Sequence, residues 1–312
     1  MILLVSHRGD PHLGPVLAGL LRRRQRTAIL DTGRFPTLGR LDLRLGGAGL
    51  ERLRVAAGPG TFEAREIAAV WWWRPLPCEP DRRMPLASHR EVARLETAAA
   101  LGGLLRCTRA LWVNEPAAAR EAEHKVWQLR LARECGLAVP RTCVTGLPAQ
   151  ARAFLREVAP GRAVFKALDV RPETWRETRL VGPEERSLLP LLRHAPVLFQ
   201  EHVPGVDLRV TCVGRRLFAA EIDARHTSSP HDYRLALGQA RVRPARLPAE
   251  VRRGLRTLLS RLGLRYGAVD LRRSADGEHL FLEVNPAGQF HFVEQRTGQP
   301  IGEALCDLLA SG

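Results

Sequence analysis

Glu283 and Asn285 lie two residues apart near the end of an alternating apolar segment, residues 279–285. Side chains two residues apart in a β-strand point to the same face, so this spacing places a carboxylate beside a carboxamide. Pro286 ends the expected strand, because proline has no N–H group to donate to a sheet. These oxygen ligands suit a hard cation such as Mg²⁺, which takes few ligands from the protein and the rest from phosphates and water.

Asp270 is the third candidate metal ligand, and its place depends on the turn between two strands. Residues 274–277 end in Asp-Gly, which is a strong signal for a β-hairpin. A turn of two or four residues puts Asp270 on the face that carries Glu283, whereas a turn of three residues breaks this arrangement. A hairpin with an ordinary solvated polar face is the alternative, and spacing alone does not separate the two interpretations.

Two lysines form the second group of candidate residues. Lys125 and Lys166 are the only lysines among 48 Lys and Arg residues, which indicates a coding bias that replaces lysine with arginine. We expect a lysine to persist where a compact ammonium is needed and a planar guanidinium does not fit, and phosphate oxygens are one such partner. Survival by chance is the alternative interpretation.

Together these residues resemble the ATP-grasp ligase superfamily. Two phosphate-binding lysines, a nucleotide-binding hinge and a metal-binding hairpin ending in Glu-x-Asn occur in that family's order, over about residues 112–312. The set is specific as a whole, whereas no single member of it is. The matching residues are Lys125, Lys166, Gln200, Glu201, His202, Val203, Asp207, Leu208, Arg209, Asp270, Glu283, Val284 and Asn285.

The resemblance implies ATP and Mg²⁺ as cofactors and gives each residue a role. Arg209 matches a family arginine that faces the transferred phosphoryl group, where a planar cation stabilises spreading negative charge. A surface ion pair is its alternative role. His202 is unusual in the hinge, where an apolar or aromatic residue is more common, and we expect it to line the base. The implied roles are phosphate binding for Lys125 and Lys166, nucleotide binding for Gln200, Glu201, His202, Val203 and Asp207, and metal binding for Asp270, Glu283 and Asn285.

Residues 224–238 follow an expected strand and are rich in arginine and histidine. They resemble the substrate segment of the superfamily, in which Arg225, Asp232 and Arg234 would hold an acidic side chain beside the γ-phosphate. A disordered lid is the alternative interpretation of this segment.

Residues 167–181 follow Lys166 and depart from the family pattern. The family covers the phosphates with a glycine-containing loop at this point, and this segment contains no glycine. Arginine side chains could clamp the phosphates instead, and a longer or more mobile hairpin is an equal alternative. The arginines concerned are Arg171, Arg176 and Arg179.

The fold expected from these patterns is α/β, with an N-terminal lobe followed by two α+β lobes that grip ATP. Apolar runs separated by a helical pattern predict that the N-terminal lobe holds a mixed sheet. No G-x-G-x-x-G motif occurs, so a dinucleotide site has no support. A long helix at residues 117–135 is expected to carry Lys125. The expected lobes are residues 1–115, 116–200 and 201–312, and the expected strands of the first lobe are residues 2–5, 27–30, 41–45, 50–55, 67–73 and 111–113.

The run Trp71-Trp72-Trp73-Arg74-Pro75 ends the strand at residues 67–73. Alternate tryptophans face opposite sides of a strand, so core packing is the preferred role, and a groove for an aromatic residue of a peptide is the alternative. This run and the closing segments 286–294 and 297–301 resemble graspetide synthetases more than amino-acid ligases. Graspetide synthetases modify ribosomally made peptides.

The composition indicates a globular protein with an anionic partner, because the chain is 45% hydrophobic and carries a formal net charge of +15. Solvated arginines are the alternative source of this charge. No apolar run is long enough to cross a bilayer, and no signal peptide is recognisable. The six scattered cysteines form no C-x-x-C motif, which favours a reducing cytoplasm. No nucleic-acid module is recognisable either, so nucleic acid is not an expected partner.

The leading hypothesis is an ATP-dependent ligase acting on an acidic ribosomal precursor peptide with a leader and a core. It would phosphorylate Asp or Glu side chains of that peptide and then close ester or amide cross-links, with no nucleophile from the protein. An amino-acid ligase of the RimK type, which adds a residue to a protein or small acid, is the first alternative. A nucleotide-binding or nucleic-acid-binding scaffold without turnover is the second. We include a homodimer among the expected partners.

Overall fold

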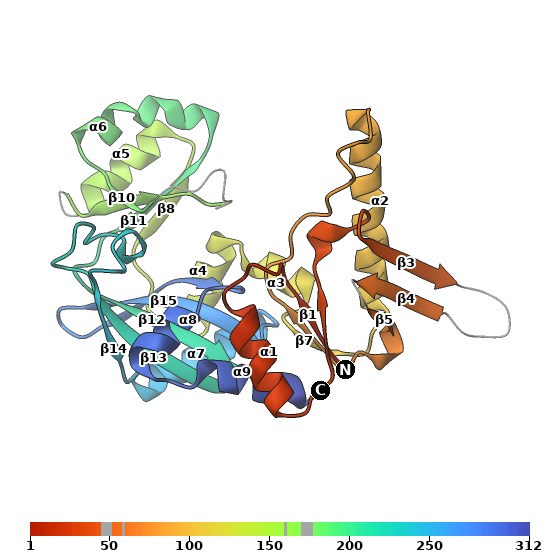
Figure 1. The fold of residues 1–312 in the computed structure, drawn as a ribbon. Coiled ribbons are helices and arrows are strands. Elements are labelled where there is room, and N and C mark those ends of the chain that lie inside the picture. The colour runs from red at the N-terminus through yellow and green to blue at the C-terminus, as the bar shows by residue number, and fades with distance from the viewer. Residues whose placement is uncertain (45–51, 58–59, 159–160, 170–176) are drawn as a thin grey trace. The chain divides into compact units, whose positions relative to one another are not determined.

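The computed structural model describes the whole chain except residues 45–51, 58–59, 159–160 and 170–176 (Figure 1). Within this described part, no helix is long and apolar enough to span a membrane. The chain forms two compact units. Unit 1 consists of Met1–Pro116, Leu264–Tyr266 and Pro300–Gly312, and unit 2 consists of Ala117–Gly263 and Gly267–Gln299.

Unit 1 is organised around a parallel four-stranded sheet in the order β2-β1-β6-β7. Strand β1 is buried over its whole length, as expected for a continuous apolar run in a parallel sheet. The sequence prediction of these strands is confirmed. The strands are β1 Ile2–Val5, β2 Thr27–Leu30, β6 Ala69–Trp72 and β7 Leu111–Val113.

A separate antiparallel sheet in the order β3-β4-β5 belongs to the same unit. Leu41 of β3 lies opposite Val55 of β4, so these two predicted strands do pair as a hairpin. The connecting residues 45–51 lie outside the described part of the chain. The single mixed sheet expected from the sequence is therefore wrong, because the antiparallel strands form their own sheet. The elements are η1 Thr32–Arg34, β3 Gly39–Arg44, β4 Arg52–Ala57, β5 Gly60–Glu63 and η2 Ala64–Glu66.

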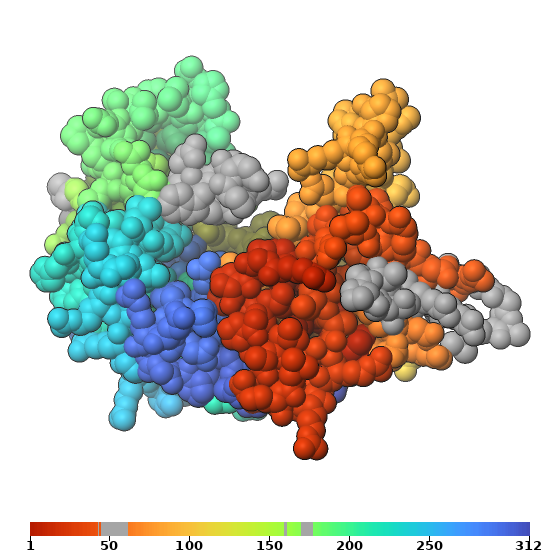
Figure 2. Space-filling model, viewed as in Figure 1, coloured from red at the N-terminus to blue at the C-terminus, as the bar shows by residue number. Residues whose placement is uncertain are grey.

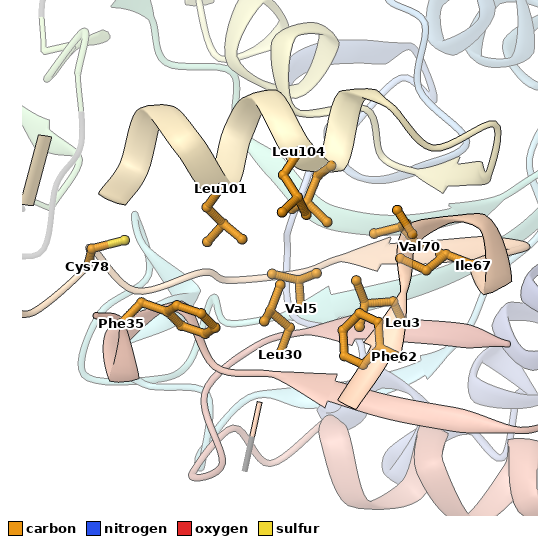
Figure 3. Close-up of a cluster of buried hydrophobic side chains, with 12 residues drawn as sticks. Leu3, Val5, Leu30, Phe35, Phe62, Ile67, Val70, Cys78, Leu101 and Leu104 are labelled. Atoms are coloured by element: carbon orange, nitrogen blue, oxygen red, sulfur yellow. The ribbon is translucent and has the colours of Figure 1, made fainter. Parts of the chain in front are cut away.

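The core of unit 1 lies between the parallel sheet and the C-terminal turns of helix α2 (Ala87–Arg106). Leu3 and Val5 of the sheet and Leu101 and Leu104 of the helix meet in this core (Figure 3). Most of the N-terminal part of α2 is exposed or half-buried, and in the space-filling view it projects from the rest of unit 1 (Figure 2, orange).

The three tryptophans of β6 and its end pack into unit 1. Trp71 and Trp73 are both buried, and their rings stack with centroids 4.9 Å apart. The indole Nε1 of Trp73 donates to Asp10 Oδ2 at 3.0 Å, which satisfies the polar atom of a buried ring. Trp72 is half-buried and packs beside Trp112. The predicted core role is therefore confirmed for this run.

The C-terminal helix α9 (Ile301–Ala310) packs against α1 (Leu13–Arg22) in unit 1. Its buried face includes Ile301 and Cys306. Gly19 of α1 permits the close approach, because a Cβ at this position would lie 2.7 Å from Cys306 Sγ. The sequence prediction grouped these residues with the third lobe, whereas their apolar face is covered by α1. The lobe boundaries themselves stay a prediction.

Unit 2 contains an antiparallel sheet in the order β10-β9-β11-β8. Helix α5 packs on it through Phe154 and Leu155, which join Phe199 of β11 in one apolar cluster. Strands β9 and β11 pair so that Lys166 lies opposite Leu198. The elements are β8 Thr142–Thr145, α5 Pro148–Glu157, β9 Ala163–Lys166, β10 Arg179–Leu180, α6 Pro183–Ser187, η4 Leu189–His194 and β11 Val197–Glu201.

A second sheet of unit 2 has the order β14-β13-β12-β15-β16. Its outer strand β16 is flanked by helix α4 and by a bridge from Ala138 to Leu280. This sheet positions the predicted metal hairpin. The elements are β12 Gly205–Val213, β13 Arg216–Asp223, η5 Tyr233–Leu235, β14 Arg241–Pro244, α7 Ala249–Arg261, β15 Tyr266–Ser274, β16 His279–Asn285 and α8 His291–Thr297.

The long helix expected at residues 117–135 is wrong, because the structure has two helices there, α3 (Pro116–Ala122) and α4 (Lys125–Glu134). His124 interrupts them with an extended backbone, φ −73° and ψ 99°, and acts as the N-cap of α4. Lys125 is therefore the first residue of α4 and not a mid-helix side chain.

Candidate functional site

Strands β15 and β16 form the predicted hairpin, and Asp270 lies directly opposite Glu283. The turn is nevertheless the three-residue turn that was expected to break this arrangement, because Ser274 N–H donates to Glu278 O at 2.9 Å across it. A β-bulge between Asp270 and Leu271 shifts the register by one residue and restores the pairing. Asp270 and Glu283 are therefore paired as expected, but through a β-bulge that was not predicted from the sequence.

The bulge also turns Leu282 toward the site. In a regular strand neighbouring residues face opposite sides, so alternation along residues 279–285 would turn Leu282 away from Glu283. The structure departs from this alternation, because both side chains line the same cavity. Phe281, in contrast, is fully buried in the core.

Lys125 is joined to this hairpin by an ion pair in which Nζ lies 2.7 Å from Glu283 Oε2. Gln128, on the next turn of α4, fixes the helix to the strand, because its carboxamide accepts from Val284 N–H and donates to Val284 O, each at 2.9 Å. Burial favours the neutral carboxyl of Glu283, but Lys125 and Lys166 outweigh burial and lower the pKa of Glu283 below its ordinary value.

Lys166, at the end of β9, donates from Nζ to Gln200 Oε1 at 2.9 Å. Gln200 is only 2% exposed, and its Nε2 donates to Thr142 Oγ1 at 3.0 Å. The Thr142 hydroxyl in turn donates to Pro140 O at 2.9 Å. Burial lowers the pKa of Lys166 from its ordinary value, and the carboxylate of Glu283 opposes this effect.

Asp270 is held by Arg209 and Tyr233. Arg209 Nη1 lies 2.9 Å from each carboxylate oxygen, and Nη2 donates to Gln289 O at 3.3 Å. The Tyr233 hydroxyl donates to Asp270 Oδ1 at 3.2 Å, and burial together with the charge of Asp270 raises the pKa of Tyr233. Gly288 allows the turn after β16 to approach Arg209, because a Cβ there would lie 2.8 Å from Nη2.

His202 and Asp207 pair with residues that the sequence reasoning missed. His202 Nε2 lies 3.3 Å from His231 Nδ1. Burial, assisted by the charge of Arg272, lowers the pKa of His202 to about 4, so this imidazole is neutral at pH 7. Asp207 Oδ1 lies 2.8 Å from Arg272 Nη1, and burial raises the pKa of Asp207 while Arg272 opposes the shift.

The predicted substrate residues separate into two groups. Arg234 binds Asp232 through two contacts of 2.7 and 2.5 Å, and Asp232 Oδ2 also accepts from Thr178 N–H at 3.2 Å. This pair therefore connects the segment to the residues just before β10. Arg225 is 57% exposed and pairs with Asp223 at 2.7 Å instead, so the structure does not bring it to the other two.

Only one of the three arginines predicted after Lys166 lies in the described part of the chain. Arg179 is half-exposed, and its guanidinium lies 3.5 Å from Glu177 and 3.6 Å from Glu185. It does not line the cavity described next. Arg171 and Arg176 lie outside the described residues.

Most of the predicted site residues, from both sheets of unit 2, line one cavity. Lys125 and Arg209 do not line it, but each is paired with a carboxylate that does. Asn285 is exposed and does not line the cavity, and its Oδ1 accepts from Ala287 N–H at 2.9 Å. The predicted residues that line the cavity are Lys166, Gln200, Glu201, His202, Val203, Asp207, Asp232, Arg234, Asp270 and Glu283.

Several lining residues were not predicted from the sequence. Arg272 could have been predicted, because it lies two residues after Asp270 and so on the same strand face. Tyr233 could also have been predicted, since it lies within the predicted substrate segment. Leu282 could not, because the bulge leaves no clear trace in the sequence. The missed residues are Pro140, Val164, Thr178, His231, Tyr233, Arg272 and Leu282.

Asp270 and Glu283 form a donor set that fits Mg²⁺. Both are carboxylates, they lie opposite each other on paired strands, and they line one cavity. In the described part of the chain, no three or more His, Cys, Asp and Glu side chains are grouped as a metal site. A cation held by these two carboxylates would therefore take its other ligands from Asn285, phosphates or water, as Mg²⁺ commonly does.

Comparison with known proteins places this arrangement in a family. No family model matches the chain, and no curated protein matches its sequence. Solved structures do match it over its whole length. The macrocyclase MdnC from Microcystis aeruginosa MRC, bound with precursor peptide MdnA, is 28% identical with a TM-score of 0.88, covering 100% of this chain and 99% of that chain. The chain is similar to this macrocyclase over its whole length.

Two further solved structures that match the chain are ATP-grasp ligases, and the chain shares their fold. PsnB, an ATP-grasp ligase complexed with a phosphomimetic variant of its minimal precursor, Mg and ADP, is 26% identical with a TM-score of 0.78 over 99% of this chain and 97% of that chain. A RiPP-associated ATP-grasp ligase of Chryseobacterium gregarium, in complex with ADP and a leader and core peptide, is 24% identical with a TM-score of 0.90, covering 99% and 96%. The latter likeness shows the fold alone. The expected fold and superfamily are confirmed, and the individual roles of the site residues stay predictions.

Proposed function

We propose that this ATP-grasp ligase phosphorylates Asp or Glu side chains of a ribosomally made precursor peptide and closes ester or amide cross-links within it, releasing ADP and phosphate. The observation that carries the proposal is the full-length match to MdnC, a macrocyclase whose structure holds a precursor peptide. That match includes unit 1 as well as the cavity of unit 2. The likeness therefore extends beyond the nucleotide-binding machinery that members of the superfamily share.

The charges around the cavity support ATP as the phosphoryl donor. Lys166 and Arg234 bring cationic groups to its wall, and Lys125 adds a third through Glu283. Such groups neutralise phosphate oxygens and orient the γ-phosphoryl group. Mg²⁺ bound at Asp270 and Glu283 would supply further charge neutralisation on the phosphates. The complex of PsnB with Mg and ADP supports the same pair of cofactors.

Arg209 has two proposed contributions. It fixes the carboxylate of Asp270, which gives a potential metal ligand one defined orientation. As the predicted catalytic residue, it would also stabilise negative charge on the transferred phosphoryl group. The nucleotide itself would be held by the hinge residues Glu201–Val203 and by Asp207, which all line the cavity.

The proposed chemistry has two steps. A side-chain carboxylate of the peptide attacks the γ-phosphorus of ATP, the bond to the β-phosphate breaks, and an acyl phosphate and ADP result. A Ser or Thr hydroxyl or a Lys amine of the same peptide then attacks the acyl carbon, phosphate leaves, and a proton is released. Arg234 would hold the carboxylate before the first step. We assign Arg225 no direct contact, because it pairs with Asp223 outside the cavity lining.

An acidic precursor suits the charge of this chain. The formal net charge of +15 attracts an acidic peptide and speeds its encounter with the protein. We further propose that the leader segment binds away from the ATP cavity, that the protein forms a homodimer, and that the reaction takes place in the cytoplasm, where ATP and the newly made peptide are both present.

The test is a reaction of the purified protein with ATP, Mg²⁺ and the small acidic peptide encoded beside its gene. The product is weighed by mass spectrometry and ADP is measured in parallel. We expect the peptide to lose the mass of one water for each ADP formed, because each link removes one water. Fragmentation of the product should locate each link at an Asp or Glu side chain.

Two results would contradict this proposal. With free amino acids added to the reaction, a peptide that gains the mass of an amino acid residue would identify an amino-acid ligase. Binding of ATP without ADP formation, with every acidic peptide supplied, would identify a scaffold without turnover. Omission of Mg²⁺ serves as the control, since ADP release should then stop.

A further inference from the structure

Gln200 is a buried glutamine whose carboxamide faces a lysine. Only 2% of the residue is exposed, although glutamine is mostly found at protein surfaces. Its Oε1 accepts from Lys166 Nζ at 2.9 Å and its Nε2 donates to Thr142 Oγ1 at 3.0 Å. Both ends of the carboxamide are therefore used inside unit 2, on the side of the sheet that faces the cavity.

The hydrogen bonds around Gln200 admit only one orientation of its carboxamide. The carbonyl of Pro140 can only accept, so the Thr142 hydroxyl donates to it at 2.9 Å. The oxygen of Thr142 then accepts from the NH₂ group of Gln200. An ammonium can only donate, so the remaining carboxamide oxygen is the partner that Lys166 requires. The chain Pro140–Thr142–Gln200–Lys166 thus has a fixed direction.

A neutral acceptor at this position keeps the charge of Lys166 available. A carboxylate would bind the ammonium as tightly but would neutralise it, and the site would attract phosphate less. Glu283 exerts such an attraction on Lys166 across the cavity, while Lys125 occupies Glu283 Oε2 at 2.7 Å. An ammonium has three N–H donors, and the bond to Gln200 uses one of them.

We propose that Gln200 is a positioning residue that aims the Lys166 ammonium at the phosphates of the bound nucleotide, with Thr142 and Pro140 fixing its orientation. This inference rests on the proposed function, because it needs a nucleotide in the cavity. It makes the nucleotide-binding role that the family resemblance implies for Gln200 an indirect one, exerted through Lys166. The other hinge residues, Glu201–Val203, would then contact the base.

The test compares two nucleotide ligands in the full-length protein. Titration calorimetry measures the dissociation constants of ADP and of adenosine, which lacks phosphates, for wild type, Gln200→Met and Thr142→Val. Gln200→Met keeps the approximate size of the side chain and removes the acceptor. We expect ADP to bind about tenfold more weakly, as for loss of a hydrogen bond to a charged group. Adenosine should bind as in wild type, and Thr142→Val should give the same pattern with a smaller change.

Thr145→Val is the matched control, because it lies on the same strand β8 and is 8% exposed. Its hydroxyl accepts only from Leu147 N–H at 2.9 Å among the described contacts, away from Lys166. We expect this variant to bind ADP and adenosine like the wild type. If Gln200→Met does not fold, Thr142→Val carries the comparison.

An equal loss of ADP and adenosine binding in Gln200→Met would overturn the inference, because it would place Gln200 at the base. Unchanged ADP binding in both Gln200→Met and Thr142→Val would overturn it as well. In either case a wild type that binds ADP and cyclises its peptide leaves the proposed function standing. A wild type that does not bind ADP would instead refute the proposed function itself.

Discussion

Replacing Lys125 by methionine tests whether its ion pair holds helix α4 on the hairpin of β15 and β16. The ammonium lies 2.7 Å from Glu283 Oε2, and the two side chains are 17% and 24% exposed. Exposed pairs contribute about 0–1 kcal/mol, whereas breaking a fully buried pair costs about 3–5 kcal/mol because a charge is left without a partner. This pair lies between these limits, so we expect Lys125→Met to lower the free energy of unfolding by about 2 kcal/mol at pH 7.

The cost of Lys125→Met should depend on pH. Burial raises the pKa of Glu283, but Lys125 and Lys166 lower it below its ordinary value of 4.5. A carboxyl group with a lowered pKa stabilises the folded state above its unfolded pKa, and this contribution is lost as the pH falls through the folded pKa. The variant loses much of this lowering. The difference between wild type and variant should therefore be largest near neutral pH and shrink as the pH falls below 4.5.

The assay is urea unfolding of wild type, Lys125→Met, Glu283→Gln and the double variant, at pH 7 and at several values down to about pH 3, inside the range between the unfolded and folded pKa of Glu283. The double variant removes both charges, so it should be as stable as Lys125→Met or more stable. We expect a coupling free energy of about 1–3 kcal/mol at pH 7, as measured for residues that share an interaction. Additive effects within about 0.5 kcal/mol at pH 7, with no change between pH 7 and about pH 3, would refute this reasoning.

Three other substitutions have defined outcomes. Tyr233→Phe removes the hydroxyl that donates to Asp270, a contribution of about 1 kcal/mol, so the Mg²⁺ concentration for half-maximal ADP release should rise severalfold while folding is retained. Gly288→Ala puts a Cβ 2.4 Å from Ala268 Cβ and 2.8 Å from Arg209 Nη2, so the turn after β16 must shift. Initial-rate kinetics should then show kcat reduced by at least about tenfold, because small misplacements of this kind are costly. Gly19→Ala should destabilise unit 1 by about 1–3 kcal/mol through overpacking against α9, measured by urea unfolding, with unchanged ADP affinity.

The predicted metal hairpin shows which structural features the sequence patterns predict and which they do not. Alternation along residues 279–285 and the Asp-Gly turn predicted two paired strands, with Asp270 on the face of Glu283 on condition that the turn had two or four residues. The structure pairs Asp270 with Glu283, although its turn has three residues. The exact turn length was not predictable, because the difference between a three-residue and a four-residue turn depends on hydrogen bonds around Ser274. The bulge that corrects the register depends on tertiary contacts. The alternation of side chains along a strand does not predict it.

The contacts of the two lysines were harder to predict from the sequence. Their rarity singled out Lys125 and Lys166, but no local pattern showed that Lys125 begins a helix, since the break at His124 has no proline or glycine to mark it. Gln200 was predicted only as a nucleotide-binding residue, whereas the structure turns its carboxamide toward Lys166. Side-chain pairs between distant segments are decided by packing, which a single sequence does not reveal.

The most direct test of the central claim follows an oxygen atom. The precursor peptide is prepared with oxygen-18 in its Asp and Glu side-chain carboxylates, and the phosphate released during cross-linking is analysed by mass spectrometry. Attack of a carboxylate on the γ-phosphorus leaves one peptide oxygen on the phosphate, so we predict one labelled oxygen in the phosphate for each link formed. Cross-linked product accompanied by unlabelled phosphate would contradict the account.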